Sequence, residues 1–356
     1  MSDSAKSRSA ARPLSLPRSA STLPPMSSRP TMHDVARLAG VSIKTVSRVV
    51  NQEPRVDPDT RSRVQEAIDE LGFRRNEQAR SLRPGQSTAL IGLVTGDLSN
   101  PFYSSIARGI EEVAHEHGHL LLTASSEEQP GRERQVIGAF LQHNVAGLVV
   151  VPTPQAHLQL TPEALRGIPV VAVDRPIGPT GTFDSVVLNN RVGAHAAVTH
   201  LLRDGHTRVA MIDGDPAVYT GRERTAGYLE ALAEAGLASD PALILQGYHG
   251  DRQAEAAMHL LLDMATRPTA VFVTNNRIAL GALKALHARR RSLALASFDD
   301  FELAGILPTP MTLVSYDAVE MGRQAARRLF GRIERRGGAP ADIIIPVKLH
   351  LPEETN

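Results

Sequence analysis

Hydroxyl and cationic side chains are concentrated in one short stretch, residues 42–51. It carries Ser42, Lys44, Thr45, Ser47 and Arg48. Serine and threonine hydroxyls suit contacts with phosphate oxygens, and a lysine can donate to guanine O6 and N7 in the major groove of DNA. The same hydroxyls could instead cap a helix or lie on its surface. The residue types favour contact with a nucleic acid, provided that the neighbouring elements present them together.

Three histidines at spacings of two form the other group that could do chemistry: His115, His117 and His119. This spacing places them on different sides of a helix, and Gly118 is typical of a helix C-terminus, so we predict a helix end rather than a metal site. The chain has no cysteine, which excludes thiolate chemistry and cysteine-ligated zinc. No nucleophile elbow, phosphate loop or HExxH motif occurs. Nothing in the sequence argues for an enzyme, a metal or a cofactor.

The cationic stretch falls in the second of three short helices predicted from Thr31 onward. Thr31 and Asp34 have the spacing of a capping box, and Asp57 before Pro58 is typical of the start of the third helix. Residues 39–42 separate the first two helices, a length that suits the turn of a helix-turn-helix. Apolar residues recur at helical spacing along the third, at Val64, Ala67, Ile68 and Leu71. We therefore predict a helix-turn-helix headpiece over residues 31–75.

Charge is distributed unevenly along the chain although the total is only +1. Residues 1–85 hold 15 Lys and Arg against 9 Asp and Glu, and the remainder holds 24 against 29. A basic end is where a polyanion would dock, yet most of the excess lies in residues 1–30, which are rich in Ser, Pro and Arg and are predicted to be disordered. The charge distribution is therefore a weak argument for nucleic-acid binding, and the predicted geometry of the helices is a stronger one.

From residue 88 onward the pattern is that of an α/β protein. Short apolar runs alternate with segments of helical period, which is typical of buried parallel strands in βαβ units. They cover residues 90–95, 120–124, 148–151, 170–173, 209–212, 243–246, 270–273 and 293–296. This number of strands is too large for one doubly wound sheet. We therefore predict two lobes with a ligand cleft between them. The first takes residues 88–187 and 317–340, and the second takes 188–316 and 341–356.

The sequence resembles the LacI/GalR family, that of the lactose and galactose repressors, over residues 31–350. The strongest matches are DVARLAGVS at 34–42, TVSRVVN at 45–51 and ARSL at 79–82, the family's hinge helix. In the body, motifs recur in the family's order: IGL at 91–93, NPF at 100–102, VDR at 173–175, DGH at 204–206, GY at 227–228, ALG at 279–281 and FDD at 298–300. The resemblance implies a bilobal, periplasmic-binding-protein-like body behind the headpiece, with a hinge helix and linker at residues 76–87.

The resemblance also implies a sequence-specific repressor that binds a near-palindromic DNA operator as a homodimer. Ile43 and Lys44 would read base edges, and Leu82 would enter the minor groove and kink the duplex, with Arg83 beside it. The implied DNA-binding residues are Ser42, Ile43, Lys44, Thr45, Ser47, Arg48, Asn51, Asn76, Arg80, Leu82 and Arg83. Against this, an exposed leucine in a polar linker can also be an ordinary surface residue.

In the body, the resemblance implies a small-molecule effector site in the cleft, lined by Phe102, Tyr103, Asp174, Arg224, Asn275 and Asp299. Carboxylates, an arginine, an amide and aromatic rings suit a sugar, and a purine is the alternative. Two departures from the family pattern occur. Asn276 stands where the family usually has Asp, and residues 292–297 lack the customary Pro-Asp and the Gly before Phe298.

Two other classes of protein share parts of this pattern. A transporter's solute-binding protein has the bilobal body, but it needs a secretory signal, which the first thirty residues do not resemble, and it lacks a headpiece. A Rossmann-type sugar enzyme needs GxGxxG after the first strand, and residues 92–96 do not fit. With no apolar run near the roughly 20 residues of a membrane span, and no heptad tail, we expect a cytoplasmic dimer without a membrane partner.

Overall fold

The computed structural model describes residues 30–51, 53, 55–73, 90–154, 156, 160–178, 181–301, 311–336 and 338–352. The chain divides into two compact units, Met1–Glu77 and Gln78–Asn356, which are considered separately. All of the predicted arm, residues 1–30, except Pro30 lies outside the described residues, as do the predicted hinge residues Asn76, Arg80, Leu82 and Arg83. The described helices include none that is long and apolar enough to cross a membrane.

The N-terminal unit is the predicted bundle of three helices: α1 (Met32–Ala39), α2 (Ile43–Val50) and α3 (Pro58–Leu71). The capping box of α1 forms as expected, because the Thr31 hydroxyl accepts from the Asp34 amide and the Asp34 carboxylate accepts from the Thr31 amide. Gly40 ends α1 at a φ of 64°, a conformation that glycine adopts without strain. The three helices bury one small core of Val35, Ala36, Ala39, Val46, Val49, Val64 and Ala67.

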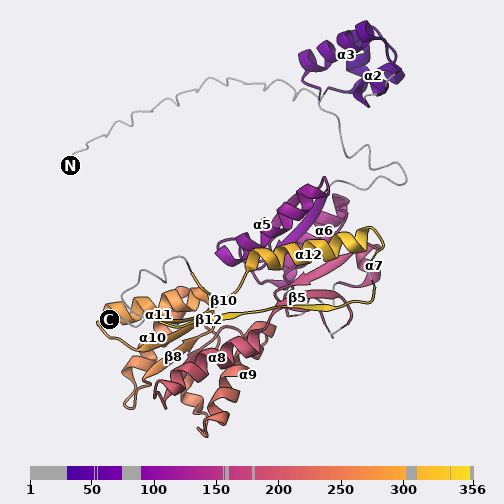
Figure 1. Cartoon of the computed structure of the whole chain (residues 1–356). Coiled ribbons are helices and arrows are strands. Elements are labelled where there is room, and N and C mark those ends of the chain that lie inside the picture. The colour runs from indigo at the N-terminus through magenta and orange to yellow at the C-terminus, as the bar shows by residue number, and fades with distance from the viewer. Residues whose placement is uncertain are drawn as a thin grey trace, which may run out of the picture. The chain divides into compact units, whose positions relative to one another are not determined.

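The C-terminal unit contains two six-stranded sheets, each covered by helices (Figure 1). The first sheet comprises β1 (Leu90–Thr95), β2 (Leu120–Ser125), β3 (Leu148–Val150), β4 (Val170–Val173), β5 (Asp184–Leu188) and β11 (Asp342–Ile345). The second comprises β6 (Val209–Ile212), β7 (Ile244–Leu245), β8 (Ala270–Val273), β9 (Ala294–Phe298), β10 (Met311–Ser315) and β12 (Lys348–His350). The predicted headpiece and bilobal α/β fold are therefore confirmed.

Helices lie on both faces of each sheet. The first lobe has α5 (Pro101–Glu116), α6 (Pro130–Gln142), α7 (Pro162–Leu165) and α12 (Ala318–Ile333). The second has α8 (Asn190–Arg203), α9 (Tyr219–Glu234), α10 (Asp251–Asp263) and α11 (Asn276–Arg289). One continuous apolar core takes residues from α5, α12, α8 and α9 together with strands of both sheets. Separate cores lie under α6 in the first lobe and under α10 and α11 in the second.

The two sheets repeat one topology. Their strand orders, β11-β5-β4-β3-β1-β2 and β12-β10-β9-β8-β6-β7, match position by position. All pairs are parallel except β12, which runs antiparallel to β10. Because the carboxyl ends of parallel strands lie at one edge of a sheet, equivalent strands of the two lobes deliver their following residues to equivalent places.

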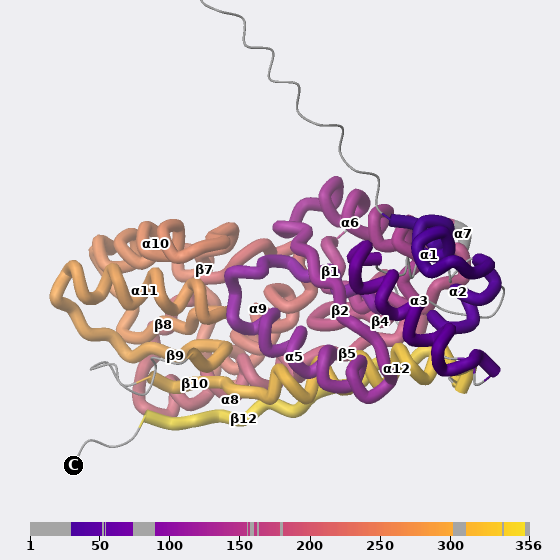
Figure 2. Tube along the Cα trace, turned by 90° about the horizontal axis from the view of Figure 1, so that it is seen from above, coloured from indigo at the N-terminus to yellow at the C-terminus, as the bar shows by residue number. Residues whose placement is uncertain are grey.

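The chain passes between the lobes three times, and the last passage corrects a prediction. It crosses after β5, after β10 and between β11 and β12, so the yellow C-terminal segment runs through both lobes in Figure 2. Residues 341–356 were assigned wholly to the second lobe, but β11 pairs with β5 in the first. The apolar run at 343–347 predicts a strand, whereas periodicity carries no information about which sheet the strand joins.

Glycines bring helices unusually close in three places. A Cβ on Gly322 of α12 would overlap the carbonyl of Ile106 in α5, and one on Gly109 of α5 would overlap the carbonyl of Val319 in α12. In the second lobe, Gly227 faces α8 and Gly281 faces α10 in the same way. The obstacle in each case is backbone, which cannot move aside as a side chain can.

We predict that Gly322→Ala lowers the free energy of unfolding by about 1–3 kcal/mol, because the added methyl forces α5 and α12 apart. Gly331→Ala, on the same helix, is the control: no atom lies within 4 Å of its Cβ position. It should be neutral or stabilising by about 0.5–1 kcal/mol, since alanine favours helix. Urea unfolding followed by circular dichroism measures both, and equal midpoints for the two variants would contradict the packing argument.

Candidate functional site

The exposed face of α2 carries most of the predicted DNA-binding side chains of the headpiece. Val46 and Val49 point into the core, while Ser42, Ile43, Lys44 and Arg48 are exposed, Ile43 to 39%. The apolar period of α2 therefore turns one polar face outward, on which Ile43 and Lys44 are adjacent.

The hydroxyls of α2 have partners within the helix. The Thr45 amide donates to Ser42 Oγ at 3.1 Å, and the two hydroxyls lie 2.9 Å apart. Asn51, the C-cap, donates through Nδ2 to Ser47 Oγ at 3.3 Å. Ser42 is thus the helix cap, as the structural alternative predicted. Arg48 pairs with Glu53 at 3.7 Å, and both side chains are about half exposed, so its guanidinium remains accessible.

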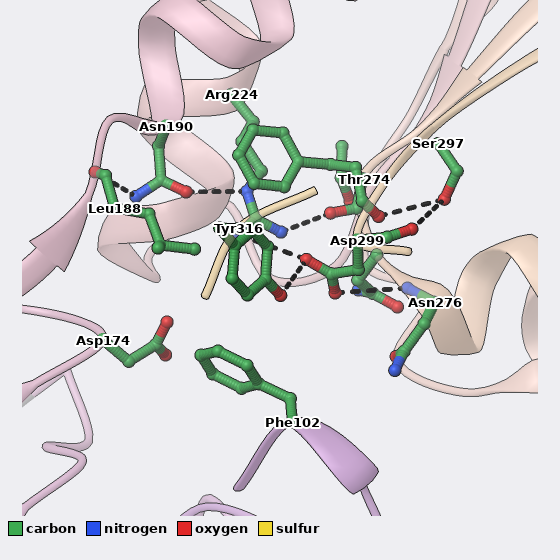
Figure 3. Close-up of polar contacts among 12 residues, drawn as sticks. Phe102, Asp174, Leu188, Asn190, Arg224, Thr274, Asn276, Ser297, Asp299 and Tyr316 are labelled. Carbon is green, nitrogen blue, oxygen red and sulfur yellow. Dashed lines mark hydrogen bonds and ion pairs between the residues drawn. The ribbon is translucent and has the colours of Figure 1, made fainter. Parts of the chain in front are cut away.

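In the C-terminal unit, all six predicted effector residues line one cavity of about 240 Å³ between the lobes. Phe102, Tyr103 and Asp174 come from the first lobe, and Arg224, Asn275 and Asp299 come from the second. Figure 3 shows Phe102 and Asp174 opposite the polar network around Arg224 and Asp299. The structure therefore brings together six residues that are up to 197 positions apart, Phe102 to Asp299.

A larger hollow of about 960 Å³ lies beside Phe102 and Tyr316. It is lined by none of Asp174, Arg224 or Asp299. It also adjoins Phe301, after which a segment outside the described residues begins. The smaller cavity is the better candidate for a ligand because buried polar groups from both lobes converge on it.

Asp174 and Asp299 occupy equivalent positions in the two lobes. Each follows the fourth strand of its sheet, β4 or β9, and has a positive φ, 74° and 76°. The Asp174 amide donates to Val186 O at 2.9 Å, and the Asp299 amide donates to Val314 O at 3.1 Å. Aspartate tolerates this left-handed conformation better than most residues, so the turn puts a carboxylate at the cleft edge of each sheet.

Arg224, on the first turns of α9, is 6% exposed and is held from several sides. Its Nε donates to Asn190 Oδ1 at 2.8 Å, Nη1 donates to the carbonyl of Thr274, and Nη2 lies 3.8 Å from Asp299 Oδ1. The guanidinium carbon also lies 3.7 Å above the centre of the Phe298 ring, a cation–π contact. The planar guanidinium of arginine can contact all of these partners at once, whereas the single ammonium group of a lysine cannot.

Asp299 connects Arg224 with Tyr316, a cleft residue that the sequence did not identify. The Tyr316 hydroxyl donates to Asp299 Oδ1 at 2.6 Å, and the Asn276 amide donates to Oδ2 at 3.3 Å. Burial, followed by the nearby Asp299 charge, raises the pKa of Tyr316 well above its ordinary value, so this hydroxyl remains a donor. Tyr316 lies between β10 and α12, on a crossover between the lobes.

In the first lobe, Arg175 and Glu128 form a network that the sequence also missed. Arg175 donates to both Glu128 carboxylate oxygens at 2.8 and 2.9 Å, to the Tyr103 hydroxyl at 3.2 Å and, through Nε, to Asp174 Oδ2 at 3.2 Å. Burial raises the pKa of Asp174 and of the Tyr103 hydroxyl. Arg175 directly follows Asp174, which could have drawn attention to it, but nothing local singles out Glu128.

Asn275 and Asn276 have different roles at the start of α11. Asn275 caps the helix, its Oδ1 accepting from the Ile278 amide at 2.9 Å, so its amide group is what remains for a ligand. Asn276, one departure from the family pattern, donates to Asn100 Oδ1 in the other lobe at 3.1 Å. Phe102 packs against Tyr103 and Tyr316, with ring centres 5.0 and 5.6 Å apart, and provides an apolar wall.

The histidine group ends α5, as predicted. His117 is the C-cap, Gly118 has a φ of 68°, and His117 stacks on Phe330 with ring centres 4.0 Å apart. In the part of the chain that the structure describes, no group of three or more histidines or carboxylates is placed to hold a metal ion. His117 and His119 therefore pack against Phe330 of α12.

We predict that Arg224→Lys lowers the free energy of unfolding by about 2–4 kcal/mol, because Asn190 and Asp299 lose a buried partner. The control is Arg222→Lys, on the same helix, whose side chain is 61% exposed, pairs with Glu223 at 3.7 Å and lies 5.6 Å from the centre of the Tyr219 ring. That control should stay within about 0.5 kcal/mol of the original chain. Urea titration measures both, and comparable losses would show that the buried network does not need the guanidinium.

Comparison with known proteins supports both halves of this arrangement. A model of the bacterial regulatory proteins of the lacI family matches residues 31–76, and one of the periplasmic binding proteins and sugar binding domain of the LacI family matches residues 88–353. The transcriptional regulator GalR of Escherichia coli is 33% identical over 315 residues, covering 86% of this chain and 90% of that protein. The regulator DegA of Bacillus subtilis is 34% identical over 336 residues, 92% and 98% of the two chains.

Solved structures give the same result. The regulator CelR in complex with cellobiose matches with a TM-score of 0.68 and 32% identity, covering 91% of this chain and 99% of that one. The lac repressor dimer bound to operator and the anti-inducer ONPF matches with a TM-score of 0.78 and 26% identity, covering 92% and 99%. With its capped helix-turn-helix and its two matched lobes, the chain belongs to the LacI family of bacterial DNA-binding transcriptional regulators.

Proposed function

We propose that this protein is a homodimeric repressor whose affinity for a near-palindromic operator is set by a sugar bound between its lobes. The observation that carries the sugar assignment is the cavity in which Asp174 and Asp299 face each other from equivalent turns, with Arg224 and Phe102 beside them. Carboxylates accept from ligand hydroxyls, arginine and asparagine donate, and an aromatic face covers the apolar side of a pyranose. A purine-responsive regulator is the alternative.

The size of the cavity favours a small ligand. Its volume of about 240 Å³ lies below the roughly 300–1,000 Å³ typical of sites for drug-sized molecules. A monosaccharide or a small glycoside fits this limit best. No cofactor and no catalytic step enter the proposal, and the relatives named above are regulators rather than enzymes. We place the protein in the cytoplasm, where an operator is accessible.

On DNA, α2 would lie in the major groove. Lys44 would donate to guanine and Ile43 would contact a thymine methyl, while Thr45, Ser47 and Arg48 approach phosphates. Two hinge segments, one per subunit, would meet over the minor groove, where Leu82 kinks the duplex and Asn76, Arg80 and Arg83 hold the backbone. A two-fold dimer reads a two-fold site, which is why the operator should be nearly palindromic.

Ligand and DNA would be coupled through the angle between the lobes. A ligand that bridges Asp174 and Asp299 favours one lobe arrangement, and Tyr316, bonded to Asp299, lies on a segment that crosses between lobes. A change in that angle would alter whether the two hinge segments of a dimer can meet.

We predict that Lys44→Ala changes base preference, costing about 1–3 kcal/mol at one base position of each half-site and little at the others. Sites selected from a random duplex library, followed by anisotropy titration of single-base variants, measure this. Arg63→Ala is the matched control, since it removes one exposed positive charge from α3. It should weaken all sequences equally, if at all, and an unchanged preference in Lys44→Ala would refute the reading role.

We also predict that at least one neutral sugar raises the melting temperature of the full chain and shifts its operator affinity. A screen of sugars and purines by thermal shift tests this, because a ligand that binds the native state stabilises it by mass action. Arg224→Lys should lose the response while Arg222→Lys keeps it. Stabilisation by purines alone would replace the sugar assignment by the purine one.

A further inference from the structure

The charges that line the cleft are unbalanced. The basic side chains are three arginines, Arg175, Arg224 and Arg277, and one histidine, His249. Against them stand six carboxylates: Asp97, Glu128, Asp174, Asp213, Asp215 and Asp299. Burial raises the pKa of Asp174, and even without that residue five carboxylates stand against the three arginines. The interior of the cleft is therefore negative with or without Asp174.

The two buried arginines already contact acceptors of the chain, Arg175 most completely. Arg175 uses four of its five N–H groups on Glu128, Asp174 and Tyr103. Arg224 is held by Asn190 and the carbonyl of Thr274 and lies beside Asp299. Recognition of a phosphate by arginine needs a free fork of parallel donors, and the fork of Arg175 is closed by both oxygens of Glu128.

Arg277 is linked to a carboxylate through the hydroxyl of a serine. Its Nη1 donates to Ser99 Oγ at 3.2 Å, and the same hydroxyl donates to Asp97 Oδ2 at 2.8 Å. The Ser99 amide also donates to Asp97, at 2.8 Å. One N–H group of Arg277 is thus linked through Ser99 to the Asp97 carboxylate.

The helix N-termini that reach the cleft are likewise occupied. The positive end of a helix would otherwise attract an anion. Asn100 caps α5 and Asn275 caps α11, whose Asn276 amide also donates to Asp299. Val218 gives α9 no side-chain cap, but the position of a Cβ on Gly221 lies 3.0 Å from Asp213 Oδ2, so a carboxylate already lies against its first turn.

We infer that the cleft selects an uncharged ligand and excludes phosphate esters and other anions, and that Glu128 is the residue that sets this selectivity by closing Arg175. The inference rests on the proposed ligand site and narrows its chemistry to an unphosphorylated molecule. A phosphate group brought near the excess carboxylates is repelled. The fork of Arg175, which would offset that repulsion, is occupied by Glu128.

Matched pairs of ligands test the inference by isothermal titration calorimetry on the full chain. Each neutral sugar and nucleoside of the screen is compared with its own phosphate ester, and inorganic phosphate is titrated alone. We expect a neutral compound to bind, its ester to bind at least about tenfold more weakly, and inorganic phosphate to give no saturable binding. An ester that binds as tightly as its parent, or saturable phosphate binding, would overturn the inference.

Two variants separate the role of Glu128 from total charge. Glu128→Gln keeps the shape but opens Arg175, and should reduce the preference for the neutral partner by about tenfold. Glu127→Gln removes the same charge from the neighbouring residue, which pairs with Arg132 and does not line the cleft. Its preference should match that of the original chain within about twofold. Equal effects of the two variants would remove Glu128 from the explanation.

Failure of the sugar proposal can be told apart from failure of this inference. Binding of a neutral nucleoside without its nucleotide would defeat the sugar assignment and support the exclusion of anions. Tight binding of a sugar phosphate would support the sugar assignment and defeat the exclusion of anions. If no compound of the panel binds, inorganic phosphate decides, because it probes the closed arginines without reference to any sugar.

Discussion

A guanidinium removed from water must find acceptors where it lies, and Arg224 imposes that requirement on the second lobe. Its four partners come from three places in the sequence: Asn190 at the start of α8, Thr274 after β8, and Phe298 and Asp299 at the end of β9. All of these partners must be correctly placed around the guanidinium, because a buried charge without partners strongly destabilises the fold. The cleft wall is therefore specified as a unit, and the carboxylate offered to a ligand is one that the arginine already orients.

The duplicated topology explains why the cleft has two facing halves. Equivalent turns after β4 and β9 present Asp174 and Asp299, each in a left-handed conformation and each tied to the next strand through its amide. The half in the first lobe is closed by Glu128 around Arg175, whereas the half in the second lobe is extended by Tyr316. Contacts between Asn276 and Asn100, and between Arg277 and Ser99, join the lobes at the mouth.

Much of this could be predicted from sequence, and the rest could not for definite reasons. Caps such as Thr31 with Asp34 are local, and the apolar runs of βαβ units are strong signals, so the headpiece and the bilobal body were identified correctly. The six cleft residues followed from a family resemblance, not from periodicity. Strands β5 and β10 were missed because polar residues interrupt them, as in Asp184-Ser185-Val186.

The residues that were not predicted from the sequence share one property: their role depends on contacts with partners distant in the chain. Glu128 meets Arg175 across 47 positions, and Tyr316 meets Asp299 only because β10 returns beside β9. The wrong assignment of β11 to the second lobe has the same origin, since the apolar pattern of a strand carries no information about which sheet the strand joins. Local chemistry identifies elements, and three-dimensional pairing decides which of their side chains work together.

The three passages between the lobes also set the order in which the protein can be completed during its synthesis. The first sheet needs β11, and its helix α5 needs α12 as a packing partner through Gly109 and Gly322. Both arrive only after nearly all of the second lobe has been made. While the chain is still growing, the first lobe has an uncovered helix face and an open strand edge, and such surfaces are prone to aggregation. The newly made chain is therefore most vulnerable late in translation, until residues 318–345 have emerged and the first lobe can close.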